Sequence, residues 1–299
     1  MSGTIKTVAM IGAGFMGGQI SARAAIYGYE TRVYDINSSA LETCKNVTNF
    51  YIDGHFPENK EEAEKAKKRM TFYQDVKECV RDADIIIEAV TENVEVKKKV
   101  FTEIEAASPL HAIIATNSSS LPVSRIEGAV KNKERLANIH FYQLPQRNFV
   151  DIMKGTKTSD EVFAKVEDWV RSVDCVPLIV KRESMGFVFN RVWRAAKKDA
   201  LAVWAGGYAD FKDVDRAWMI FTGMPAGPFG LMDFVGLDVI YNVEMAYYDE
   251  SGDPKDRPPQ ALKQMIDRGE LGMKTGKGFY DGWPTPEFTN PEFLNPRKK

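Results

Sequence analysis

Short apolar runs alternate with helix-like segments through the first half of the chain. The run at 7–11 ends in glycine and leads directly into a segment with helical periodicity at 16–26. Near-continuous apolar runs of strand length, separated by helical segments, predict a parallel sheet that is buried on both faces. The other segments that fit this pattern are the runs at 31–35, 84–90, 111–116, 136–141, 149–153 and 176–180, and the amphipathic stretch at 159–172.

The pattern changes after residue 183. From 186 to 204 the apolar residues repeat with helical spacing and give no strand signal. The chain then continues as helical segments broken by glycine and proline. We therefore predict an α/β protein in which a Rossmann-like doubly wound sheet, residues 1–183, is followed by an all-helical domain, residues 184–299.

The composition and the net charge argue against some classes of binding partner. The 299 residues carry 40 Lys and Arg against 42 Asp and Glu, a net charge of −2. Such a chain is not expected to bind nucleic acid or an anionic membrane, and no apolar run approaches the ~20 residues of a membrane-spanning helix. The N-terminal residues show no secretory or transit pattern, and Cys44, Cys79 and Cys175 form no CxxC motif. We expect a cytoplasmic protein with buried free thiols.

A glycine-rich turn follows the first predicted strand. Gly12, Gly14 and Gly17 form a GxGxxG pattern that leads into a helix. In this context the glycines permit a tight turn, close approach of the backbone to a pyrophosphate, and close packing of helix on strand. Asp35 ends the second predicted strand, where a carboxylate accepts from an adenosine ribose hydroxyl and repels the 2′-phosphate of NADP. The pattern predicts NAD as the cofactor; the weaker alternative is an incidental glycine-rich turn.

Several further segments resemble the L-3-hydroxyacyl-CoA dehydrogenase family, and they extend over essentially the whole chain. Their order and spacing are specific as a set, although no single segment would be. The segments are IGAGFMG at 11–17, IEAVTEN at 87–93, TNSSSLP at 116–122, HFY at 140–142, GFVFNR at 186–191, PAGPFGLMD at 225–233, GLD at 236–238 and KTGKGFY at 274–280.

This resemblance implies a role in fatty acid metabolism: oxidation of a 3-hydroxyacyl-CoA to the 3-oxo form with NAD, or the reverse, in an interdomain cleft of a homodimer. It places His140 as the base that accepts the hydroxyl proton while hydride leaves C3. Ser119 and Asn190 match the family's polar residues around the reacting oxygen. From the pattern alone, His140 could equally be a core residue, and Ser119 and Asn190 could make local backbone bonds.

The resemblance also enlarges the cofactor site beyond the glycine turn. It assigns Phe15, Met16, Glu92, Lys97 and Asn117 to dinucleotide binding, with Glu92 and Lys97 near the ribose and nicotinamide. For Lys97 the alternative of an ordinary exposed lysine stays open. No metal site is expected.

The carboxylate partner of the histidine departs from the family pattern. The family follows its histidine with Phe-Phe-Asn-Pro and, about a dozen residues later, with a glutamate that orients the imidazole. Here Phe141, Tyr142 and Gln143 follow His140, and the candidate partner is Asp151, which comes one residue early and is one methylene shorter. An aspartate can still bond an imidazole N–H if the backbone lies closer. The alternative is a solvent-facing acid at a strand end, which would leave the pair incomplete.

Two more departures concern the substrate. The family usually carries a lysine-rich helix that contacts the CoA phosphates, but the corresponding stretch at 46–56 has no lysine. Either the basic residues of 65–69 take over, namely Lys65, Lys67, Lys68 and Arg69, or the substrate is not the usual acyl-CoA. Trp193 follows Asn190 where relatives carry smaller residues, so it lines the substrate pocket or packs between helices.

Three functions therefore compete. The leading one is NAD-dependent dehydrogenation of a 3-hydroxyacyl-CoA. The second is a dehydrogenase of a small free 3-hydroxy acid, similar to the gulonate and carnitine dehydrogenases, which the missing lysine helix favours. The third is an NADH-binding protein with little turnover, expected if Asp151 fails to hold His140. Turnover of CoA thioesters against free hydroxy acids separates the first two, and NADH binding without any turnover identifies the third.

Overall fold

The protein is seen here in a computed structural model that describes residues 5–119 and 121–295. Ser120, which belongs to the serine-rich segment noted above, lies outside these ranges. The chain divides into two compact units, Met1–Val188 and Phe189–Lys299, and each is described by itself. Within the described ranges, no helix has the length and apolar character needed to cross a bilayer. The three cysteines are free and buried, as predicted.

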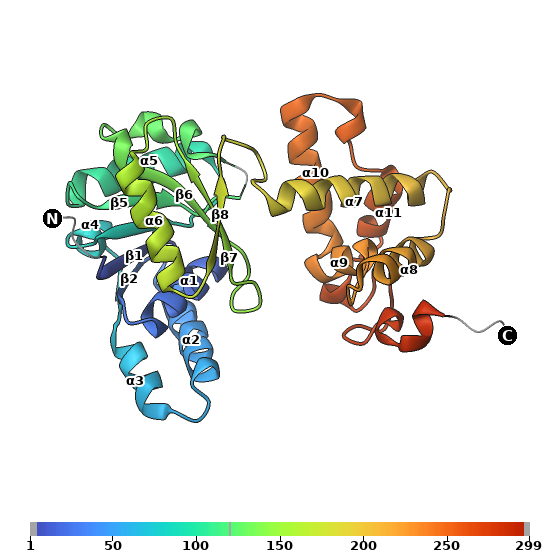
Figure 1. The fold of residues 1–299 in the computed structure, drawn as a ribbon, viewed down its shortest axis with the longest axis horizontal. Helices are drawn as coiled ribbons and strands as arrows, with labels where there is room; N and C mark the ends of the chain where they lie inside the picture. Colours follow the sequence, from blue (N-terminus) through green and yellow to red (C-terminus); the bar gives the residue numbers. More distant parts are fainter. Residues whose placement is uncertain (1–4, 120, 296–299) are drawn as a thin grey trace. The chain divides into compact units, whose positions relative to one another are not determined.

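An eight-stranded sheet forms the centre of the first unit (Figure 1). Its strand order is β3-β2-β1-β4-β5-β6-β7-β8, and the pairs from β3 to β6 are all parallel. The order reverses direction at β1 and β4, as in doubly wound sheets, which confirms the predicted class. The strands are β1 Thr7–Ile11, β2 Glu30–Tyr34, β3 Met70–Tyr73, β4 Ile85–Glu88, β5 Ile113–Thr116, β6 Leu136–Phe141, β7 Phe149–Lys154 and β8 Val176–Val180.

Helices cover both faces of this sheet (Figure 1). One face packs against α1 (Phe15–Ile26) and α6 (Asp160–Ser172), and the other against α4 (Val76–Val80) and α5 (Val94–Ala107). Burial on both faces explains why strands such as β4 are apolar almost throughout. The helices α2 (Ser38–His55) and α3 (Lys60–Lys68) form a pair that extends away from the sheet. Short 3-10 segments lie at Val123–Arg125, Glu127–Ala129 and Lys133–Arg135.

The second unit is helical, as predicted. Its core contains Leu201, Phe229, Met232 and Tyr280, which are almost fully buried. The helices are α7 Phe189–Ala205, α8 Phe211–Thr222, α9 Pro228–Val235, α10 Leu237–Ser251 and α11 Gln260–Asp267, with 3-10 segments at Pro254–Asp256, Met273–Thr275, Glu287–Thr289 and Pro291–Leu294.

Two features of the sheet differ from the sequence prediction. Strand β3 was not predicted, because it has only four residues and directly follows a highly charged helix. Strands β7 and β8 were found in sequence but do not continue the parallel series, since β7 pairs antiparallel with β6. The link at 142–148 is too short for a crossover helix, so the chain turns back on itself.

Candidate active site

The glycine turn joins β1 to α1 at the carboxyl edge of the sheet. Gly12 has a φ of +108°, which favours glycine, and its N–H donates to the Tyr34 carbonyl at 2.8 Å. A side chain at Gly17 would place its Cβ only 1.9 Å from the Gly12 oxygen, so helix and turn require this glycine. At Gly14, by contrast, an added Cβ meets nothing within 4 Å.

The start of α1 presents backbone donors without a side-chain cap. Gly14 occupies the N-cap position, and no side chain caps the helix within the described structure. The first N–H groups of such a helix, with its dipole, form a binding site for a phosphate group. Phe15, beside this end, is 60% exposed, and Met16 is half-buried. The open space at Gly14 and these donors fit the pyrophosphate of a dinucleotide.

Asp35 lies just beyond the end of β2 and faces the same turn. Its Oδ2 accepts from the Ala13 N–H at 2.9 Å, and its Oδ1 accepts from the Asn37 N–H at 2.9 Å. The next residue, Ile36, is 83% exposed. The carboxylate therefore holds the glycine turn and remains half-buried at the edge where a ribose hydroxyl would donate to it.

A buried ion-pair network connects the ends of β4 and β5. Lys97 is 1% exposed, and its Nζ lies 2.7 Å from Oε1 of Glu88 and 3.2 Å from Oε2 of Glu92. Glu88 is fully buried and also accepts from the Thr116 hydroxyl at 2.7 Å. The alternative of an ordinary exposed lysine at position 97 is therefore wrong. Since two carboxylates hold its ammonium group, Lys97 fixes Glu92, which remains 39% exposed at the sheet edge.

In the serine-rich segment after β5, two neighbouring side chains are buried and the next one is exposed. Asn117 is buried, and its Oδ1 accepts from the Phe141 N–H at 2.8 Å, next to His140. Ser118 is also buried, and its hydroxyl donates to Glu92 and accepts from the Leu121 N–H. Ser119 is exposed. Asn117 and Ser118 therefore hold this edge of the sheet together, and the register leaves Ser119 open to a ligand.

His140 and Asp151 face each other across the antiparallel pair β6–β7. Their Cα atoms are register partners, and the side chains are 6% and 0% exposed. The imidazole Nδ1 lies 3.5 Å from Oδ2 of Asp151. Direct cross-strand neighbours have close Cβ atoms, so a shorter aspartate can reach the ring. The alternative of a solvent-facing acid at position 151 is wrong.

Two aromatic rings surround this pair. Phe187 stacks on the imidazole, with ring centroids 5.2 Å apart and an interplanar angle of 14°. Its backbone has a φ of +52°, which is rare for an aromatic residue, and it follows Gly186, whose φ is +76°. Tyr142 meets the imidazole edge-on at 4.5 Å and donates its hydroxyl to Oδ2 of Asp151 at 2.6 Å.

Asn190 belongs to the second unit, at the start of α7, and is half-buried. Trp193, three residues later, packs against the core of that unit together with Trp204. These contacts favour the helix-packing interpretation of Trp193. No cluster of three or more His, Cys, Asp or Glu side chains suited to a metal occurs among the described residues.

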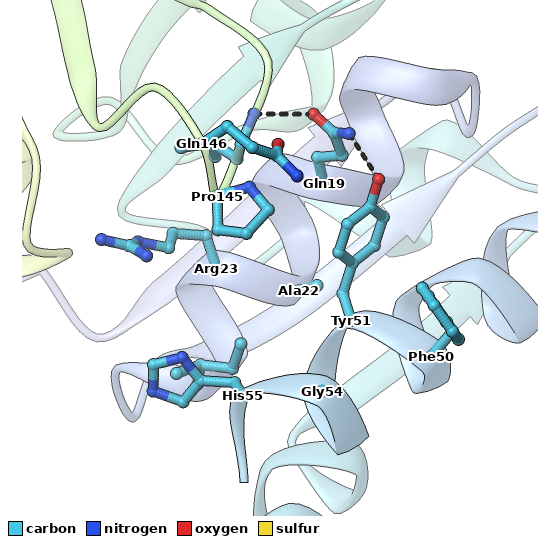
Figure 2. A pocket seen from close by; sticks show the side chains of 11 residues that line it. Gln19, Ala22, Arg23, Phe50, Tyr51, Gly54, His55, Pro145 and Gln146 are labelled. Carbon is cyan, nitrogen blue, oxygen red and sulfur yellow. Dashed lines mark hydrogen bonds between the residues drawn. The ribbon is translucent and has the colours of Figure 1, made fainter. Parts of the chain in front are cut away.

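A pocket of about 270 Å³ lies between α1, α2 and the loop after β6. Figure 2 shows Gln19 at its rim, donating to the Tyr51 hydroxyl at 2.6 Å and accepting from the Leu144 N–H at 3.0 Å. The guanidinium of Arg23 donates to the Val173 carbonyl at 2.7 Å and so is turned to the protein. Most of its lining residues are apolar or uncharged, and Arg23 and His55 also line it.

Of the four basic residues that could replace the lysine-rich helix, Lys65 and Lys67 are paired within the fold, whereas Lys68 is exposed and Arg69 donates to the Ala25 carbonyl at 3.2 Å. Lys65 contacts Glu61 at 2.8 Å and Glu62 at 2.9 Å, and Lys67 contacts Asp53 at 2.7 Å. Exposed pairs of this kind are weak and can rearrange. They nevertheless offset much of the positive charge that could have replaced the family's lysine-rich helix.

Sequence reasoning gave no role to four residues that organise the site: Glu88, Tyr142, Phe187 and Gln19. A signal existed for two of them. Glu88 is a carboxylate inside an apolar strand, and such a buried charge requires a partner. Tyr142 carries a hydroxyl where the family pattern has phenylalanine. The contacts of Phe187 and Gln19 come from segments distant in sequence, and no local pattern indicates them.

Comparison with known proteins gives a consistent result. A family model described as 3-hydroxyacyl-CoA dehydrogenase, NAD binding domain, matches residues 7–184, and one described as 3-hydroxyacyl-CoA dehydrogenase, C-terminal domain, matches 186–282. The chain is 32% identical to the 3-hydroxybutyryl-CoA dehydrogenase of Clostridioides difficile, covering 92% of this chain and 98% of the relative.

Solved structures agree over similar lengths. An (S)-3-hydroxybutyryl-CoA dehydrogenase from Ralstonia eutropha is 30% identical with a TM-score of 0.86, covering 93% of this chain and 99% of that one. A diketoreductase described as acting on dicarbonyl compounds is 32% identical with a TM-score of 0.85 and the same coverage.

Proposed function

Because the chain belongs to the 3-hydroxyacyl-CoA dehydrogenase family, whose members are NAD-dependent oxidoreductases, we propose that it interconverts a 3-hydroxyacyl-CoA and the 3-oxoacyl-CoA. The observation that carries this proposal is the buried His140–Asp151 pair. It lies at the end of β6, on the sheet edge that also carries the glycine turn.

His140 acts as the base in the oxidation direction. With Nδ1–H directed toward Asp151, the Nε2 lone pair accepts the proton of the C3 hydroxyl. The buried carboxylate stabilises the imidazolium that results, and the stacked Phe187 limits rotation of the ring. In the reduction direction the imidazolium returns this proton to the oxygen at C3.

The cofactor is held by the first unit. Gly12, Gly14 and Gly17 receive the pyrophosphate at the start of α1, Asp35 accepts from the adenosine ribose, and Glu92 borders the nicotinamide end. When bound, NAD supplies the hydride acceptor. In this proposal the region 1–183 provides the cofactor site, and 184–299 contributes to substrate binding and to a homodimer.

The oxygen at C3 needs donors as its negative charge develops. We assign this role to the exposed hydroxyl of Ser119 and the amide of Asn190. The oxygen of Asn117 accepts from the Phe141 N–H and so holds the backbone beside His140.

A second candidate is supported by Lys65 and Lys67, whose ammonium groups are paired with carboxylates of the fold. A substrate without the CoA nucleotide, such as a small free 3-hydroxy acid or a dicarbonyl compound, needs no phosphate site. The likeness to the diketoreductase is in keeping with this reading.

A substrate panel with NADH separates the two candidates. Oxidation of NADH is followed by absorbance with acetoacetyl-CoA, acetoacetyl-pantetheine and free acetoacetate. The leading proposal predicts the highest kcat/KM for the CoA thioester. Equal or higher kcat/KM for the substrates without the nucleotide favours the second candidate, and NADH binding without turnover of any of them contradicts both.

A further inference from the structure

Two buried polar atoms in the site have no hydrogen-bond partner in the described structure. They are the Nδ1 of His140 and the Oδ1 of Asp151. One can donate and the other can accept, and they belong to side chains already facing each other across β6 and β7. Nδ1 nevertheless lies 3.5 Å from Oδ2 of the same carboxylate, beyond good hydrogen-bonding distance, so the position of this carboxylate decides how well it holds the imidazole.

The other carboxylate oxygen is already engaged. Oδ2 of Asp151 accepts the Tyr142 hydroxyl at 2.6 Å, a short bond of the kind expected for an ionised acceptor. Tyr142 is itself 9% exposed, and its ring lies between those of His140 and Phe149, each with a centroid 4.5 Å away. The phenol is therefore fixed by packing and holds one oxygen in a defined place.

We propose that Tyr142 is a positioning residue that anchors the carboxylate of Asp151 beside His140. Its hydroxyl holds Oδ2, which lies 3.5 Å from Nδ1 of His140, so the carboxylate stays turned to Nδ1–H and Nε2 is directed to the substrate. The aspartate and the tyrosine together perform the task that the family gives to a longer glutamate. The catalytic meaning of this arrangement rests on the proposed function.

The phenol also sets the electrostatic field at the imidazole. A hydrogen bond donated to the carboxylate disperses its negative charge, so the carboxylate attracts the imidazolium less strongly. Among the described residues, Asp151 from β7 and Tyr142 from the chain that follows β6 are the titratable groups in contact with His140, and the stacked Phe187 is neutral. Removing the hydroxyl should therefore favour the protonated imidazole.

Titration of His140 by NMR tests this directly and without substrate. The chain has three histidines, and His55 and His111 are exposed, so they serve as internal references. The test variant is Tyr142→Phe. The matched control is Tyr280→Phe, which also removes a buried hydroxyl bonded to a carboxylate, at 3.1 Å from Asp215 in the second unit.

In Tyr142→Phe the midpoint of the His140 titration should rise relative to the wild type, because the carboxylate without the phenol attracts the imidazolium more strongly. It should stay unchanged in Tyr280→Phe. In an Asp151→Asn background the Tyr142→Phe substitution should have no effect, because the carboxylate transmits it. An unchanged midpoint in Tyr142→Phe, or an equal rise in the Asp151→Asn background, overturns the proposal.

A second measurement covers the case in which Tyr142→Phe does not fold. Biosynthetic replacement of tyrosine by 3-fluorotyrosine makes the phenol a stronger donor and should lower the midpoint of His140. A midpoint unchanged by fluorination overturns the proposal.

Turnover then connects the arrangement to the reaction. With acetoacetyl-CoA and NADH, the plateau kcat of Tyr142→Phe should fall about ten-fold, because the ring loses its defined orientation, and the pH profile should move with the NMR midpoint. If the midpoint shifts as expected while the wild type turns over no substrate, the proposed function fails and the role of Tyr142 stands. If the wild type is active and the midpoint does not move, the reverse holds.

Discussion

Single buried carboxylates bind backbone groups of neighbouring segments in this protein and hold those segments together. Asp215, in α8, accepts from the Phe229 and Gly230 N–H groups at 2.8 Å and so caps α9 from a distance. Burial raises the pKa of this carboxyl to about 6, although the two backbone bonds oppose the rise. Burying the ionised carboxylate of this cap therefore costs free energy, and the cost depends on pH.

Asp215 contributes more to the free energy of unfolding at acidic pH than at neutral pH. An unfolded aspartate titrates near 3.9, so between about pH 4 and 6 the unfolded chain loses this proton before the folded protein does. The stability contribution of Asp215 is fully present below pH 4 and declines as pH rises to 6. We predict that the free energy of unfolding of the wild type, minus that of Asp215→Asn, falls by roughly 2–3 kcal/mol from pH 4 to 7.

Denaturant unfolding followed by tryptophan fluorescence measures this, because four of the five tryptophans lie in the second unit. Asp238→Asn, in the same unit, is the control of opposite sign. A hydrogen bond from Lys274 lowers the pKa of Asp238, so its stabilising contribution is lost as pH falls. A pH-independent difference for Asp215→Asn would rule out the raised pKa.

At the scale of elements, two glycines of the turn are expected to have different roles: Gly17 in folding and Gly14 in cofactor binding. A Cβ at Gly17 collides with the Gly12 oxygen at 1.9 Å, whereas a Cβ at Gly14 meets no protein atom within 4 Å. We predict that Gly17→Ala lowers the melting temperature of the free protein. Gly14→Ala should leave it unchanged and weaken NADH binding at least ten-fold, because the pyrophosphate approaches the backbone there.

Thermal unfolding and fluorescence titration with NADH measure the two effects. Gly54→Ala, in α2, provides a control, since a Cβ there also meets nothing within 4 Å and the position is far along the chain from the turn. Equal NADH affinity in Gly14→Ala and wild type would contradict the assignment of this turn to the pyrophosphate.

The sequence pattern predicts the strands of the sheet but not the direction of each strand. Strands such as β1, β4 and β6 were predictable because burial on both faces makes them apolar throughout. The periodicity of a strand carries no sign of its direction, so the reversal at β7 had to come from the structure. That reversal matters for the site, because it brings Asp151 into register with His140.

For the site itself, the glycine turn and Asp35 could be predicted from local context, whereas the role of His140 came from the family resemblance, since the pattern alone allowed a core histidine. The contacts of the Tyr142 hydroxyl and of the stacked Phe187 ring could not be predicted, since their partners are chosen by tertiary packing.

At the scale of the whole molecule, the chain forms two units with separate cores. Along one edge of its sheet, the first unit holds the glycine turn, the Lys97 ion-pair network and the pair of His140 and Asp151. The pair lies on β6 and β7, whereas the glycine turn and Asp35 lie at the ends of β1 and β2, so the proposed proton transfer and the proposed cofactor binding can be tested by separate mutations.

The most direct test of the account is therefore His140→Ala, measured for both NADH affinity and turnover of acetoacetyl-CoA. The account predicts that kcat falls ~10²–10⁴-fold, the value of positioned proton transfer, while the Kd for NADH stays near that of the wild type. Turnover that survives in His140→Ala would contradict it, as would a loss of NADH binding large enough to explain the loss of rate.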